Sequence, residues 1–130
     1  MYFMNNSDKR DYDRMFIQIP CVIYTDNGME FECITYDISE NGIQLRILND
    51  KLNGYHFEKK QIVKLLFTDE LGIYSDKDSD AYIVSCDIII VRISFDDKTI
   101  ILGCNARSPV FADYVFHKKF AAYFKYRIDK

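Results

Sequence analysis

The sequence contains no tryptophan, only two prolines and only two histidines among 130 residues. His56 and His117 lie far apart, and no GxSxG, HExxH or phosphate-binding glycine loop accompanies them, so no catalytic constellation is visible. No window reaches the roughly 18 uninterrupted apolar residues that a membrane-spanning helix needs. Basic charge is not in excess either, since 17 lysines and arginines face 20 acidic residues. These absences argue against an enzyme, a membrane span and a general DNA- or RNA-binding protein.

Metal-site spacing is also missing, because no cysteine belongs to a CxxC motif or lies near a pair of histidines. The cysteines all fall in segments that we predict to be strands: Cys21, Cys33, Cys86 and Cys104. We therefore expect buried free thiols, with no metal and no cofactor. The N-terminal apolar run of four residues is too short for a signal peptide and lacks its basic flank, so a cytoplasmic protein is expected.

Short strand patterns make up most of what is present. Apolar and polar residues alternate, or β-branched residues accumulate, in six segments: 16–24, 29–36, 43–47, 61–68, 82–95 and 99–104. Turn-forming residues such as Asp26–Gly28 and Asp96–Lys98 separate several of these segments. Six strands with hairpin connections predict a mainly β fold, a six-stranded antiparallel β-barrel.

A C-terminal helix is predicted to follow, since Ser108 can cap the first N–H groups and Pro109 suits the first helical position. One apolar face should pack on the barrel: Val110, Tyr114, Ala121, Phe124 and Ile128. A second aromatic face is left for self-association or a protein partner: Phe116, Phe120 and Tyr123. The whole chain is then a single domain, with an N-terminal arm at 1–14, the barrel at 15–107 and the helix at 108–130.

Two short motifs carry the clearest chemistry. The first has two arginines four residues apart, Arg10 and Arg14, and the second has Asp37, Ser39 and Gly42. A planar guanidinium donates two hydrogen bonds to a phosphate or to the O6/N7 edge of guanine. A carboxylate has the opposite polarity and accepts from the N1 and N2 donors on the other edge of guanine. A glycine lets the backbone pass close to a ligand or adopt a positive φ.

This pair of motifs, RxxxR followed by DxSxxG, resembles the PilZ family of cyclic di-GMP receptors, and the resemblance extends over nearly the whole chain. It implies a barrel with a C-terminal helix, bacterial origin and a role in second-messenger signalling without catalysis. It also implies that Arg10 and Arg14 clamp phosphates and guanines, that Asp37 and Ser39 meet a guanine edge, and that Gly42 shapes the turn. Many family members carry an aromatic residue three positions after a glycine of the last strand, where this chain has Ala106 after Gly103.

The charge around the arginine motif is balanced, because residues 8–14 contain three acidic and three basic side chains. Long-range attraction for an anionic nucleotide should therefore be small, and affinity should come from close contacts. The N-terminal arm lacks periodicity, which predicts a mobile segment that becomes ordered when the nucleotide binds. The alternative is a PilZ-like adaptor that acts through protein contacts and has little or no nucleotide affinity.

Overall fold

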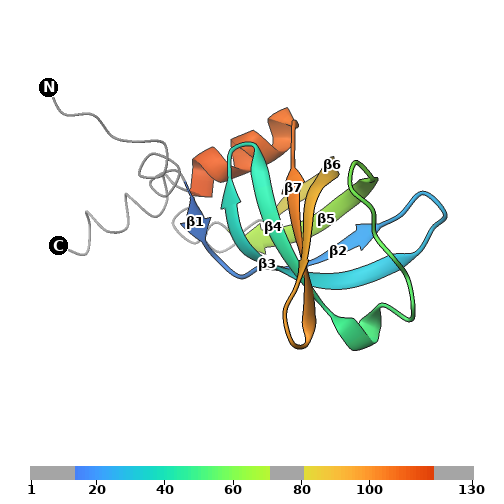
Figure 1. Cartoon of the computed structure of the whole chain (residues 1–130). Coiled ribbons are helices and arrows are strands. Elements are labelled where there is room, and N and C mark those ends of the chain that lie inside the picture. The colour runs from blue at the N-terminus through green and yellow to red at the C-terminus, as the bar shows by residue number, and fades with distance from the viewer. Residues whose placement is uncertain (1–13, 71–80, 119–130) are drawn as a thin grey trace, which may run out of the picture.

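The computed structural model describes residues 14–70 and 81–118, which form β-strands and one helix (Figure 1). The strands are β1 (Met15–Phe16), β2 (Pro20–Tyr24), β3 (Glu30–Ser39), β4 (Gly42–Leu48), β5 (Ile62–Glu70), β6 (Ala81–Phe95) and β7 (Thr99–Asn105). A short 3-10 helix, η1 (Asn49–Lys51), follows β4, and the C-terminal helix begins at 109 and is described to 118. This arrangement confirms the predicted mainly β class.

The sheet closes on itself. Its strands follow the order β1-β3-β2-β5-β6-β7-β4, and β4 also pairs with β3, so six antiparallel strands form a ring. The predicted six-stranded barrel is therefore confirmed, with β1 as a seventh, two-residue strand on β3. Closure leaves few unpaired strand edges, because each of the six strands hydrogen-bonds to a neighbour on both sides.

One predicted strand, 16–24, is divided in two. Between β1 and β2 the backbone bonds to the buried side chain of Thr35, whose hydroxyl oxygen accepts from Ile19 N–H at 2.8 Å and whose O–H donates to the carbonyl of Ile17. Pro20 then begins β2, at a position where its missing N–H costs no central hydrogen bond. The division allows β1 and β2 to pair with different stretches of β3.

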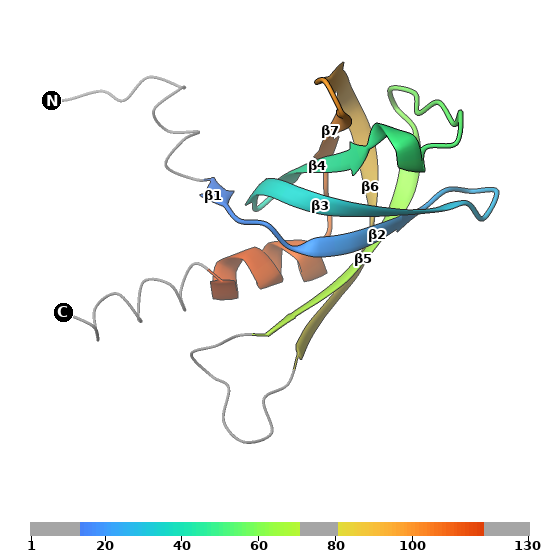
Figure 2. The same cartoon turned by 90° about the horizontal axis from the view of Figure 1, so that it is seen from below.

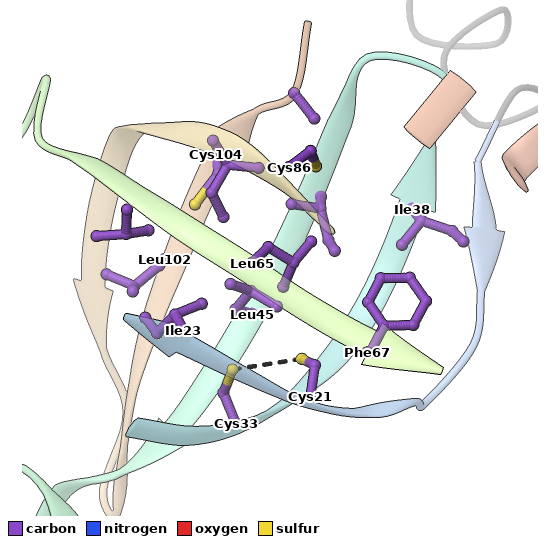
Figure 3. Close-up of a cluster of buried hydrophobic side chains, with 14 of the residues drawn as sticks. Cys21, Ile23, Cys33, Ile38, Leu45, Leu65, Phe67, Cys86, Leu102 and Cys104 are labelled. Carbon is purple, nitrogen blue, oxygen red and sulfur yellow. Dashed lines mark hydrogen bonds between the residues drawn. The ribbon is translucent and has the colours of Figure 1, made fainter. Parts of the chain in front are cut away.

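The barrel interior is filled by alternate residues of the six strands, mostly isoleucine, leucine and valine (Figure 3). The four cysteines belong to this core as buried free thiols, as predicted. Cys21 and Cys33 face each other across β2 and β3 with their Sγ atoms 3.3 Å apart. The hydrogen bond with Cys21, together with burial, raises the pKa of Cys33, and burial raises the pKa of Cys104 to about 12. The Cys33 and Cys104 thiols therefore stay protonated and act as small apolar side chains.

The C-terminal helix lies on the same side of the barrel as β1 in both views (Figures 1 and 2). Its start is as predicted, since the N–H of Phe111 donates to Ser108 Oγ at 3.2 Å and the helix begins at position 109. No helix within the described residues is long and apolar enough to span a membrane.

The face that the helix buries matches our prediction at Tyr114 and differs from it at Val110. Phe111, Tyr114 and Val115 are buried, and the Tyr114 ring packs edge-on against Phe67 with centroids 5.3 Å apart. Val110, which was expected on the buried face, is 46% exposed. The buried positions follow the i, i+3, i+4 spacing from 111, so the contact stripe is rotated by about one residue from the expected one. The predicted positions from Ala121 onward lie outside the described residues.

Candidate functional site

A polar pocket of about 340 Å³ lies on the outer surface of the barrel, beside the β3–β4 hairpin and next to β1. Its polar side chains come from β3, the β3–β4 turn, β4, β6, β7 and the segments beside β1 and β7: Arg14, Asp37, Ser39, Asn41, Gln44, Arg92, Asn105 and Arg107. In Figures 1 and 2 the β3–β4 hairpin lies close to β1 in both views. Residues that are far apart in sequence are thus brought to one concave surface.

Four of the five predicted site residues line this pocket. Arg14 comes from the segment before β1, Asp37 and Ser39 from the end of β3, and Gly42 from the start of β4. Arg10 lies outside the described residues. Arg14 of the first motif and the three residues of the second, separated by more than twenty residues of sequence, therefore line one pocket.

Arg14 and Asp37 form an ion pair, with Arg14 Nη1 donating to Asp37 Oδ2 at 3.1 Å. The Asp37 side chain is only 7% exposed and that of Arg14 is 27% exposed. A buried carboxylate without a partner would be costly, so Arg14 stabilises Asp37 while Asp37 orients the guanidinium. Arg14 keeps further N–H groups, since only one is used by Asp37 in this contact.

A β-bulge turns Asp37 toward the pocket. Thr35 pairs with Leu45 and Asp37 pairs with Gln44, so Tyr36 is an extra residue in β3. Thr35 and Leu45 face the interior, and strict alternation would direct Asp37 inward as well. The extra residue moves Asp37 to the outer face beside Gln44 and returns the next residue to the core.

The turn between β3 and β4 is tight, because Ser39 pairs directly with Gly42. Gly28 and Gly54 have positive φ values, whereas Gly42 does not, so the turn does not require glycine at position 42 for its backbone conformation. A methyl group at position 42 would lie 3.4 Å from Ser39 Oγ and 3.6 Å from the carbonyl oxygen of Cys104. Both are ordinary van der Waals distances, so the turn itself could accommodate a methyl group, and of the two roles considered for Gly42 only the close approach of a ligand would call for glycine.

Two arginines of the pocket, Arg92 on β6 and Arg107 after β7, were not identified from the sequence. With Arg14 they give three positive charges against the single carboxylate of Asp37, a net charge of +2 in a chain with a net charge of −3. The local neutrality of residues 8–14 therefore understates the attraction of the site for an anion. The missed signal was a lone arginine within the apolar run from 88 to 95.

The chain matches the family model described as "PilZ domain" over residues 8–108. No curated protein matches it. Among solved structures it is similar to the Bacillus subtilis inhibitor of motility MotI/DgrA, with a TM-score of 0.61 and 13% identity over 90% of this chain and 50% of that one.

Two further solved structures have a similar fold. YcgR from Escherichia coli, in complex with c-di-GMP, gives a TM-score of 0.60 and 13% identity, covering 89% of this chain and 46% of YcgR. MrkH from K. pneumonia in its apo state gives a TM-score of 0.58 and 12% identity, covering 88% of this chain and 50% of MrkH. The chain thus spans about half the length of these proteins, and the likeness at such low identity concerns the fold.

The Arg14–Asp37 pair predicts a clear effect on stability. Arg14→Ala leaves the Asp37 carboxylate buried without its partner, and we expect the free energy of unfolding to fall by about 1 to 3 kcal/mol. The double variant Arg14→Ala/Asp37→Ala should recover part of this loss, because no unpaired charge remains. Denaturant titration followed by circular dichroism measures all three proteins.

A matched control is Lys51→Ala, which removes an exposed ion pair with Glu32 whose side chains are 47% and 72% exposed. Its effect should stay below about 0.5 kcal/mol. If Arg14→Ala is as mild as Lys51→Ala, the Arg14–Asp37 pair does not stabilise the fold.

Proposed function

The chain belongs to the PilZ domain family, and on this premise we propose that it is a receptor for cyclic di-GMP in the bacterial cytoplasm. PilZ domains are binding domains of cyclic di-GMP effectors and adaptors, and the YcgR structure with a similar fold contains c-di-GMP. The proposed role is to relay the level of the second messenger to a partner, and it requires no catalysis. The proposed binding residues are Arg10, Arg14, Asp37, Ser39 and Gly42.

The observation that carries this proposal is that Arg14 and the three residues of the DxSxxG motif line one pocket with excess positive charge. Arg14, Asp37, Ser39 and Gly42 surround a volume of about 340 Å³ on the outer face of the barrel. Cyclic di-GMP carries two phosphodiester anions and two guanines, so it needs cationic donors together with an acceptor for guanine N–H groups. The pocket supplies both kinds of group.

Arg14 is suited to this ligand because Asp37 already holds it in place. A guanidinium oriented before binding loses less side-chain entropy when it contacts a phosphate or the O6/N7 edge of guanine. Asp37 retains acceptor capacity, and Ser39 offers a hydroxyl that can donate or accept beside it. Adenine presents a donor where guanine presents O6, so an arginine placed for guanine leaves both groups unpaired with adenine.

For the relay we propose that the N-terminal arm, residues 1–14, is drawn against the barrel by the nucleotide. Arg10 and Arg14 belong to this arm, and Arg14 lies directly before β1 and lines the pocket. Ligand contacts with both arginines would hold the arm in place and change the surface that a partner meets. The cost is about 1 to 2 kcal/mol of conformational entropy per residue fixed, which opposes binding.

An adaptor that acts through protein contacts is the second candidate, and one observation favours it. Phe116 on the C-terminal helix is 58% exposed, and its ring contacts only the neighbouring His117 ring among the aromatic pairs of the described residues. We propose that Phe116, with Phe120 and Tyr123, binds a partner protein or a second copy of the chain. Phe120 and Tyr123 lie outside the described residues. This role is compatible with nucleotide binding or can replace it.

The receptor function predicts saturable binding of cyclic di-GMP. Arg10→Ala and Arg14→Ala should each weaken binding by about 1 to 3 kcal/mol, which is the contribution of a bidentate arginine contact. Cyclic di-AMP should bind at least about tenfold more weakly, because adenine places a donor where guanine offers O6 to an arginine. Isothermal titration calorimetry measures each affinity, with Lys51→Ala as a surface control. A chain that binds neither nucleotide is not the proposed receptor.

The relay predicts a change in backbone protection. Hydrogen exchange should slow in residues 1–14 and in Asp37–Gly42 when cyclic di-GMP is added, with little change in the C-terminal helix. Mass spectrometry of peptides from the free and saturated protein provides the comparison. Equal exchange of residues 1–14 in the two samples would rule out ordering of the arm as the relay.

The adaptor role predicts that the aromatic face binds a second copy of the chain at high concentration or binds a partner protein. Exchange of Phe116 and Phe120 for serine should leave a folded barrel that still binds nucleotide and sediments at a lower mass than the wild-type chain. Analytical ultracentrifugation over a wide concentration range tests this. If the wild-type chain sediments as a monomer and the double variant unfolds, these rings stabilise the fold and form no interface.

A further inference from the structure

Among the strand pairings of the described residues, both register shifts lie at the pocket. The first places Asp37 opposite Gln44, as described above, and the second lies in β6. There Ile90 pairs with Cys104 and Arg92 pairs with Gly103, so Val91 is the extra residue. Ile90 and Cys104 are buried, and uninterrupted alternation would direct Arg92 into the core too. The bulge instead places Arg92 on the outer face of the barrel.

These pairings align four residues in one row across four neighbouring strands. Asp37 of β3 pairs with Gln44 of β4, Gln44 pairs with Gly103 of β7, and Gly103 pairs with Arg92 of β6. Three strand spacings of about 4.8 Å give the row a length of roughly 14 Å. The carboxylate that orients Arg14 therefore stands at one end of the pocket, and a second arginine stands at the other end.

Gly103 provides room for the Arg92 side chain. A methyl group at position 103 would lie 2.9 Å from Arg92 Nη2 and 3.1 Å from its Cζ, so the guanidinium lies directly over this glycine. Gly103 does not have a positive φ, so its backbone conformation alone does not require glycine. The absence of a side chain here lets Arg92 extend along the row toward the centre of the pocket.

Arg92 also has no acidic partner among the described residues. Within residues 14–70 and 81–118 Arg92 forms no salt bridge, whereas Arg14 is paired with Asp37 and Arg46 lies within 4.0 Å of Asp96. An exposed arginine on a strand is usually just solvated, but Arg92 combines a bulge, a glycine beneath it and a place in the wall of the pocket. These three features together indicate a binding role.

We propose that Arg92 is a third nucleotide-binding arginine, which contacts a phosphate of the ligand at the end of the pocket opposite the Arg14–Asp37 pair. This inference rests on the proposed function and extends it to a residue outside both motifs. A cyclic dinucleotide carries two phosphates on opposite sides of its ring, so cations at the two ends of one row suit it. Gly103 acts as a positioning residue, because it keeps space for the Arg92 side chain.

The test is calorimetric titration of the full chain with cyclic di-GMP. Arg92→Ala should weaken binding about tenfold, and Arg92→Lys, which keeps the charge without the planar fork, should stay within about threefold of the wild-type affinity. The matched control is Lys64→Ala, which removes one exposed positive charge from β5 outside the pocket and should change affinity less than about twofold. Circular dichroism confirms that each variant is folded.

A double-mutant cycle tests the role of Gly103. Gly103→Ala should weaken binding severalfold by displacing the Arg92 guanidinium, and it should have almost no effect in the Arg92→Ala background. Equal effects in the two backgrounds would show that Gly103 does not act through Arg92. Unchanged affinity of Arg92→Ala, or equal weakening by Arg92→Ala and Arg92→Lys, would overturn the phosphate contact while leaving the receptor function intact. Absence of binding by the wild-type chain would instead overturn the receptor function itself.

Discussion

Pairing of β3 with β4 is the interaction on which the rest of the structure depends, because it closes the sheet into a barrel. β3 is ten residues long and pairs with β1, β2 and β4, so it connects the first hairpin to the strand that completes the ring. Once the ring is closed, the interior takes one residue in two from every strand, and the core excludes water without disulfide bonds. The end of β3 pairs with β1 as well, and this second pairing brings the DxSxxG segment beside Arg14, which directly precedes β1.

The candidate site exists because the inward–outward alternation of side chains is interrupted by a bulge in β3 and another in β6. A regular strand would direct Asp37 and Arg92 inward, where an uncompensated charge is costly. One extra residue in each strand, Tyr36 in β3 and Val91 in β6, moves these charged side chains to the outer face and leaves the core apolar. Glycines at the floor of the pocket, Gly42 and Gly103, then leave space between the charged walls. The same two bulged segments of β3 and β6 therefore complete the barrel wall and supply charged side chains to the pocket.

The strands and turns could be predicted because alternation, β-branched runs and turn residues are local signals. Asp26–Gly28, for example, gives a hairpin with Gly28 at a φ of 85°. Bulges depend on the register between strands, so the sequence did not reveal that Arg92 leaves the core face of the segment from 82 to 95. Helix rotation was also missed, since both Val110 and Phe111 are apolar and only packing against the barrel decides which is buried. The grouping of Arg14 with Asp37 and Ser39 came from the resemblance to a family.

We propose that cyclic di-GMP binds along the row from Asp37 to Arg92 on the outer face of the barrel. The most direct measurement is a nuclear magnetic resonance titration that follows the backbone amides of the isotope-labelled chain. Shift changes should concentrate at Arg14, at 37–44 and at 91–92 and 103–107, while the opposite strand pair β2–β5 remains unaffected. Changes concentrated on β2 and β5, or no saturable changes at all, would contradict the account.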